Sequence, residues 1–171
     1  CVYTPLKARS AANTAVGAVA GALPVLIGWS ASGDSLSLDG GPLSTGFRAA
    51  GLFLIVYLWQ FPHFMAIAWI YRKQYSAAGL QMLTVVDPTG RRAGAQAVFG
   101  ALALIPISLL PAMQSAGQLY IAGASILGLA YLVASAIFCW KRDESSARLL
   151  LQTSLVYLPA LLLLFVLSPF I

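Results

Sequence analysis

Charged and metal-binding side chains are scarce in this sequence of 171 residues. Only 9% of the residues are Asp, Glu, Lys or Arg, and the chain contains one histidine and two cysteines. Cys1 and Cys139 have no ligand-like spacing, which argues against a metal site or a disulfide framework built on cysteine. The scarcity of charge also excludes an ordinary soluble domain, in which about a quarter of the residues are charged.

Apolar side chains fill the sequence instead: 60% of the residues are hydrophobic, and the mean hydropathy is +0.84. A transmembrane helix needs about 20 mostly apolar residues, and five stretches have about this length. We therefore predict an all-α fold, a polytopic transmembrane helical bundle. Because the chain opens on Cys1 rather than Met, we expect it to be part of a longer protein. The predicted spans cover about residues 14–31, 48–71, 93–113, 118–140 and 149–170.

The positive charges are distributed unevenly between the predicted loops. Every Lys and Arg except Arg48 lies in residues 1–13, 72–92 or 141–148. Loops rich in Lys and Arg stay on the cytoplasmic side of a membrane, so we expect these loops and the N-terminus inside and the C-terminus outside. The net charge of +5 then reflects topology and does not indicate a nucleic-acid partner. We also expect a short interfacial helix around residues 80–83.

The stretch WQFPHFMAIAWIYRKQYSAAG begins inside the second predicted span and ends in a basic loop, and it contains the only histidine, His63. Gln60 lies three residues earlier, so the two side chains should share one face of a helix. Pro62 removes a helix hydrogen bond and frees the carbonyl of Leu58, which predicts a kink and an opening beside His63. An ionisable group inside a membrane is a functional candidate, although a single histidine is as often a structural hydrogen-bonding residue.

Cationic side chains flank this part of the sequence on its predicted cytoplasmic side. Lys7, Arg9 and Asn13 precede the first span, and Arg72 and Lys73 follow the second. Arg and Lys bind phosphate groups well, although a purely topological role also explains their presence. Together with the polar side chains of Gln60 and His63, they favour a binding site for a large apolar substrate with a charged end.

Three stretches resemble the protoheme IX farnesyltransferase family of UbiA-type intramembrane prenyltransferases: YTPLKARSAANTAVGAVAGALPVLIGW, WQFPHFMAIAWIYRKQYSAAGLQML and SLVYLPALLLL. The resemblance implies a fold of nine transmembrane helices, of which this chain is the last five, in a bacterial inner membrane. It implies transfer of a farnesyl group from farnesyl diphosphate to a vinyl group of heme B, which gives heme O for terminal oxidases. It also implies heme A synthase as a partner.

The resemblance also implies roles for individual residues. Lys7, Arg72 and His63 would be catalytic. The diphosphate would contact Lys7, Arg9, Asn13, Arg72 and Lys73, and the heme would contact His63, Gln60, Arg91 and Arg92.

The family uses Mg²⁺, which an aspartate-rich motif outside this chain would bind. Where the second family motif carries an acidic residue, this chain has Lys73 and Gln74. Neither offers Mg²⁺ a charged oxygen, so the nearest acid, Asp87, is a weak metal candidate.

Two other functions fit the same sequence. A related prenyltransferase could act on a quinone precursor, and an assay with both acceptors separates that activity from heme farnesylation. A membrane transporter or assembly scaffold could share the topology, although transporters often contain internal repeats and none is visible here.

Overall fold

The computed structural model describes residues 13–34, 36–39, 44–110 and 117–167, and every regular element in these ranges is a helix. This confirms the predicted all-α fold class. Lys7 and Arg9 lie outside the described residues. The helices are α2 (Asn13–Ala31), α3 (Thr45–Ile70), α4 (Arg72–Ala77), α5 (Leu83–Val86), α6 (Arg91–Leu109), α7 (Gln118–Lys141) and α8 (Glu144–Leu167).

Five of these helices, α2, α3, α6, α7 and α8, are long and apolar enough to cross a membrane. Two of them begin before their apolar stretch does, α3 at Thr45 and α8 at Glu144. Both have a capped first turn. At α3 the Ser44 hydroxyl accepts a hydrogen bond from the Phe47 backbone N–H at 3.2 Å, and at α8 the Asp143 carboxylate accepts one from the Ser146 backbone N–H at 2.8 Å. Capping satisfies the free backbone N–H groups of the first turn, so each helix can begin in a polar segment before its apolar stretch. A hydropathy pattern does not show this.

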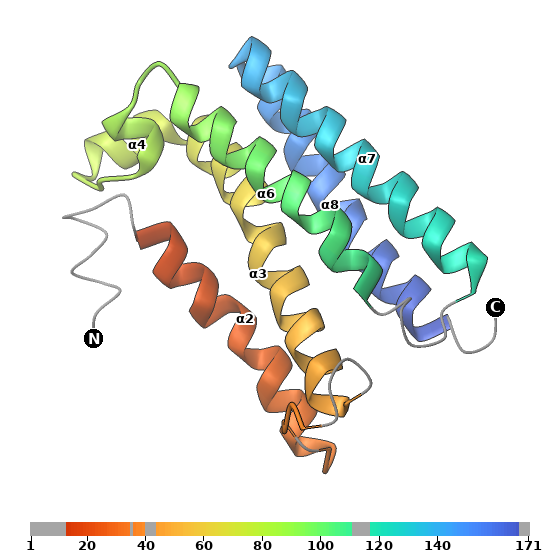
Figure 1. Ribbon diagram of the computed structural model, residues 1–171. Coiled ribbons are helices and arrows are strands. Elements are labelled where there is room, and N and C mark those ends of the chain that lie inside the picture. Colours follow the sequence, from red (N-terminus) through yellow and green to blue (C-terminus); the bar gives the residue numbers. More distant parts are fainter. Residues whose placement is uncertain (1–12, 35, 40–43, 111–116, 168–171) are drawn as a thin grey trace.

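Helix α3 is the centre of the arrangement (Figure 1). It packs against α2, α6 and α8, while α6 also packs against α7 and α7 against α8. Helices α3, α6, α7 and α8 therefore form a closed ring of four, and α2 lies outside the ring against α3.

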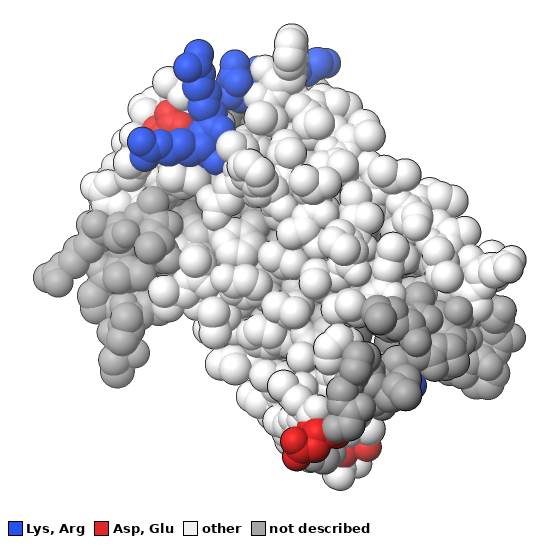
Figure 2. Space-filling model, in the orientation of Figure 1, with Lys and Arg blue, Asp and Glu red and all other residues white. Residues whose placement is uncertain are grey.

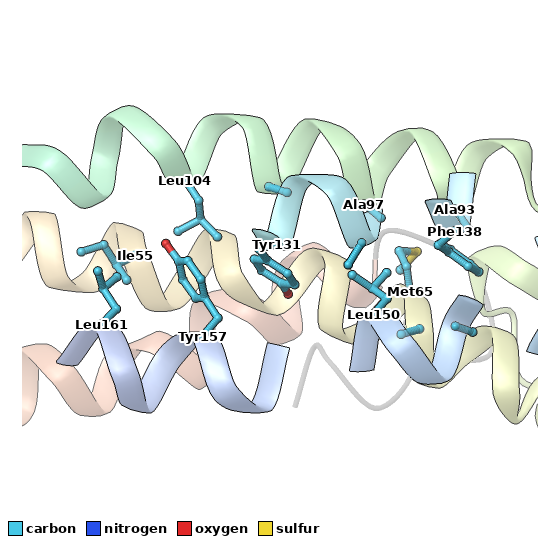
Figure 3. Packing of buried hydrophobic residues seen from close by; sticks show 14 of the residues in the cluster. Ile55, Met65, Ala93, Ala97, Leu104, Tyr131, Phe138, Leu150, Tyr157 and Leu161 are labelled. Carbon is cyan, nitrogen blue, oxygen red and sulfur yellow. The ribbon is translucent and has the colours of Figure 1, made fainter. Parts of the chain in front are cut away.

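Small residues allow the helices of this ring to approach closely. Added Cβ atoms would lie 2.8 Å from the Cys139 Cα at Gly94 and 3.0 Å from the Pro62 Cδ at Gly100. Such close packing replaces the hydrophobic driving force that is absent between helices in lipid. Larger side chains fill the interior between these contacts, among them Met65, Leu104, Tyr131, Phe138, Leu150 and Tyr157 (Figure 3).

The connection between α3 and α6 contains two short helices, α4 and α5, rather than the single interfacial helix that we predicted. Helix α5 is tied to the bundle because Thr84 is buried and its hydroxyl donates a hydrogen bond to the Ala68 carbonyl at 2.8 Å. A polar anchor of this kind carries no signal in the hydropathy pattern.

Lys and Arg side chains gather at one end of the bundle (Figure 2). Every described Lys and Arg except Arg48 lies near α4, the start of α6, or the connection between α7 and α8. Gly94 near the start of α6 lies against Cys139 near the end of α7, so these two segments lie at the same end of the bundle. We call this the basic end. The opposite end carries Asp34 and Asp39 in the connection between α2 and α3.

Candidate functional site

His63 lies on α3 and faces α8. Its Nδ1 is 2.8 Å from the hydroxyl oxygen of Ser154. One face of the imidazole stacks on Trp59, with ring centroids 4.6 Å apart and 21° between the planes. The ring is half-buried, so two neighbours hold it while part of it stays accessible.

The supporting residues are themselves fixed by hydrogen bonds. The Trp59 indole N–H donates to the Ser154 carbonyl at 2.8 Å, and the Tyr131 hydroxyl donates to the Trp59 carbonyl at 3.0 Å. Tyr131 stacks on Tyr157 with ring centroids 5.0 Å apart. We call these five residues, Trp59, His63, Tyr131, Ser154 and Tyr157, the His63 cluster. It joins α3, α7 and α8.

The sequence stretches WQFPHF and SLVY meet in this cluster, although they are far apart in the chain. Sequence reasoning selected His63 but missed Ser154, Tyr131 and Tyr157. A signal for two of them was present: Ser154 and Tyr157 are three residues apart in α8, so their polar groups lie on one face.

Gln60 points toward a different helix. Its side chain is buried, and its amide nitrogen donates to the carbonyls of Ala18 and Val56, at 3.1 Å in each case. The predicted single polar face is thus divided: Gln60 contacts α2, whereas His63 contacts α8. A separation of three residues turns side chains by about 60° around a helix, which is enough to direct them to different neighbours.

Pro62 is fully buried against α6, where it contacts Gly100. The opening that we predicted beside His63 is therefore filled on the side of Pro62. The Tyr131 hydroxyl donates a hydrogen bond to the carbonyl of Trp59 in this part of α3. This carbonyl is adjacent in the chain to that of Leu58, which Pro62 deprives of its helical donor.

Arg72 and Trp69 form the part of the site that lies at the basic end. The Arg72 guanidinium donates to the Trp69 carbonyl at 2.7 Å and lies over the indole ring, 4.5 Å from its centroid. The ring also contacts Gly90. Arg91 and Arg92 follow Gly90 directly and are exposed, so they lie near Arg72 rather than beside His63. Lys73 is also exposed, and Asn13 is the first residue of α2.

The Asp87 carboxylate caps the start of α6. It accepts hydrogen bonds from the hydroxyl and backbone N–H of Thr89, at 2.5 and 3.1 Å, and from the Arg92 backbone N–H at 2.9 Å. These bonds, the Thr89 hydroxyl first, lower the pKa of Asp87. No group of three His, Cys, Asp or Glu side chains able to hold a metal occurs in the described parts of the chain.

Comparisons with known proteins place the chain in a family. The UbiA prenyltransferase family matches residues 1–168. A protein from Solibacter usitatus named "Protoheme IX farnesyltransferase" is 43% identical over 92% of this chain and 51% of its own length. A protein of the same name from Rhodopirellula baltica is 44% identical over 95% of this chain and 56% of its own length.

A plant protein from Arabidopsis thaliana, "Protoheme IX farnesyltransferase, mitochondrial", is 36% identical over 92% of this chain and 35% of its own length. The chain thus spans about half the length of the bacterial relatives and a smaller part of the plant protein. No solved structure matches the chain. The family match covers nearly every residue, and the chain belongs to the UbiA prenyltransferase family.

Proposed function

We propose that this chain is part of an enzyme that transfers a farnesyl group from farnesyl diphosphate to a vinyl group of heme B. The observation that carries the proposal is the extended similarity to proteins named protoheme IX farnesyltransferase, at 43% and 44% identity over more than nine-tenths of the chain. The five long apolar helices support a membrane-bound site for two substrates that each combine a large apolar part with charged groups.

In the proposed reaction the bond between farnesyl C1 and the diphosphate oxygen breaks, and its electron pair leaves with the diphosphate. The heme vinyl group attacks C1, and the cation formed next to the porphyrin takes up water, which loses a proton to give the hydroxyethylfarnesyl side chain. Stabilisation of the developing diphosphate charge is the main electrostatic task in a water-poor site.

The basic end supplies cations for that task. Arg72, Lys73, Arg91 and Arg92 lie there together, and Lys7, Arg9 and Asn13 complete the proposed diphosphate site. Arg72 keeps guanidinium donors besides the one that Trp69 accepts. Since Arg91 and Arg92 are near Arg72, they are equally placed for the diphosphate and for heme propionates at this end.

His63 is the proposed contact to the heme, through the iron or a hydrogen bond. Gln60 is the weaker heme candidate because both of its amide hydrogens are already donated to backbone carbonyls. The hydrogen bond from Gln60 to Ala18 joins α2 to α3 and so holds α2 next to the proposed site.

A matched pair of arginines tests the diphosphate site. Arg72 and Arg142 both lie at the basic end, and each donates to the carbonyl three residues earlier. In membranes that contain the full reading frame of this chain, we expect Arg72→Ala to lower farnesylation of heme B by about 100-fold, the typical effect of losing one charge-stabilising donor. Arg142→Ala should leave the rate within about twofold.

The assay offers heme B and a small aromatic quinone precursor in parallel, with farnesyl diphosphate and Mg²⁺, and the products are separated by chromatography. Formation of heme O alone supports the proposal. Prenylation of the aromatic acceptor without any heme product would overturn it and would favour the alternative substrate class. Equal losses in Arg72→Ala and Arg142→Ala would remove Arg72 from the diphosphate site.

A further inference from the structure

The direction of the hydrogen bond between His63 and Ser154 follows from the number of protons available. The Ser154 hydroxyl oxygen lies 2.6 Å from the Leu151 carbonyl oxygen and 2.8 Å from the Nδ1 of His63. A hydroxyl group has one proton, and a carbonyl oxygen can only accept. The Ser154 proton therefore goes to Leu151, and the bond to His63 needs a proton on Nδ1.

We infer that Ser154 is a positioning residue that fixes neutral His63 as the tautomer with hydrogen on Nδ1 and a lone pair on Nε2. The hydrogen bond made by one ring nitrogen sets the chemistry of the other. A bare Nε2 can bind heme iron or accept a hydrogen bond, whereas a protonated Nε2 can do neither. This inference rests on the proposed function only for the identity of the ligand, heme B.

The surroundings of the ring fix its orientation as well as its proton. The Ser154 carbonyl accepts from Trp59 while the Ser154 hydroxyl accepts from His63. Trp59 covers one face of the imidazole. Since Ser154 is itself fully buried in α8, one turn of that helix holds both rings and limits rotation of His63 about its side-chain bonds. Nε2 then points away from Ser154, on the opposite side of the ring.

The tautomer can be measured directly, because substitution of His63 assigns its signals. The full reading frame is labelled with ¹⁵N-histidine, reconstituted in nanodiscs, and studied by multiple-bond ¹H–¹⁵N correlation spectroscopy at pH 7, and the signals that His63→Gln removes are those of His63. We expect a protonated Nδ1 and an unprotonated Nε2. A protonated Nε2, either in the other neutral tautomer or in the doubly protonated ring, would overturn the inference.

Matched serine variants isolate the role of the contact. In Ser154→Ala we expect the Nδ1 proton signal to be lost or averaged between the two nitrogens. Ser154→Thr keeps a hydroxyl and should retain the wild-type spectrum. Ser135→Ala is the control, because Ser135 is equally buried and its hydroxyl donates only to the Tyr131 carbonyl within its own helix. An unchanged tautomer in Ser154→Ala, or an equal change in Ser135→Ala, would contradict the inference.

Heme titration then separates this inference from the proposed function. The full reading frame is titrated with ferric heme B, and binding is followed by the Soret absorption. Outer hydrogen bonds to a ligating histidine commonly contribute 10- to 100-fold in metal affinity, so we expect Ser154→Ala to weaken binding about 10-fold and Ser135→Ala to leave it unchanged. If His63→Ala binds heme normally while the tautomer is as inferred, the proposed role of His63 in heme binding fails and the positioning by Ser154 stands.

Discussion

Gly21 is the residue that lets α2 approach α3 where the Gln60 side chain crosses between them. A Cβ atom at Gly21 would overlap the Gln60 Oε1. We expect Gly21→Ala to displace the Gln60 amide from the Ala18 and Val56 carbonyls and to destabilise the fold by about 1–3 kcal/mol, a typical cost of overpacking. Thermal unfolding of the protein in detergent measures the change.

Gly28, in the same helix, is the control for this prediction. A Cβ atom there would meet nothing within 4 Å. Gly28→Ala should therefore leave the melting temperature unchanged or raise it slightly, because alanine is the better helix former. Equal melting temperatures for the two variants would contradict a close contact between α2 and α3 at Gln60.

Thr84 is the polar anchor between α5 and α3. Thr84→Val keeps the shape of the side chain but removes the hydrogen bond to the Ala68 carbonyl, which is 2.8 Å long and buried. We expect a loss of about 1 kcal/mol of stability, with faster amide exchange in residues 83–86. Thr153→Val removes a hydroxyl bond of similar length within α8, to Leu149, and should not change exchange in α5.

At the scale of elements, two helices begin with an aspartate cap at the basic end. The Asp143 carboxylate accepts a hydrogen bond from the Ser146 backbone N–H at 2.8 Å at the start of α8, as Asp87 does from Arg92 for α6. Hydrogen bonding to Ser146, followed by the charge of Lys141, lowers the pKa of Asp143 below its ordinary value of 3.8.

A lowered carboxyl pKa makes these caps sensitive to acid. Because the folded state holds the proton less tightly than the unfolded state, the caps contribute fully above pH 3.8, and their contribution is lost as the pH falls through the lower folded pKa. We expect the melting temperature to drop with pH in that range, and less steeply in Asp143→Asn. Parallel curves for the wild type and the variant would show that the cap does not respond to pH.

The limits of helices were predictable where hydropathy changes and unpredictable where capping decides. The start of α2 and the end of α7 agree with the predicted limits to within about one residue, since apolar runs end there. The start of α8 lies five residues before the predicted Leu149, because Asp143 and Ser146 initiate the helix in a polar segment. The sequence shows these cap residues but not whether the backbone uses them.

For the whole molecule, the sequence indicated the fold class and selected His63 but could not supply its surroundings. Ser154 lies 91 residues from His63 in the chain, and no local periodicity connects them. Gln60 differs in the other direction. Its spacing from His63 predicted a common face, but its amide donates a hydrogen bond to α2 instead. Which neighbour a polar side chain meets depends on how the helices assemble, and that information is not in the spacing within one helix.

The concentration of Lys and Arg at the basic end leads to a prediction of orientation. Because Lys- and Arg-rich loops remain on the cytoplasmic side, the basic end should face the cytoplasm and the end with Asp34 and Asp39 should face outward. Single cysteines at Ser32 and Ser76 test this in a background with Cys1 and Cys139 replaced by serine. Both serines are exposed, and they lie at opposite ends of α3.

In intact cells, a membrane-impermeant maleimide should label Ser32→Cys but not Ser76→Cys, and permeabilised cells should show equal labelling of both. The proposed diphosphate site needs this orientation for a diphosphate that reaches it from the cytoplasm. Labelling of Ser76→Cys alone in intact cells would turn the bundle over. Arg72, Lys73, Arg91 and Arg92 would then face away from any cytoplasmic diphosphate, and the proposed reaction would lose its site even if the helical packing were correct.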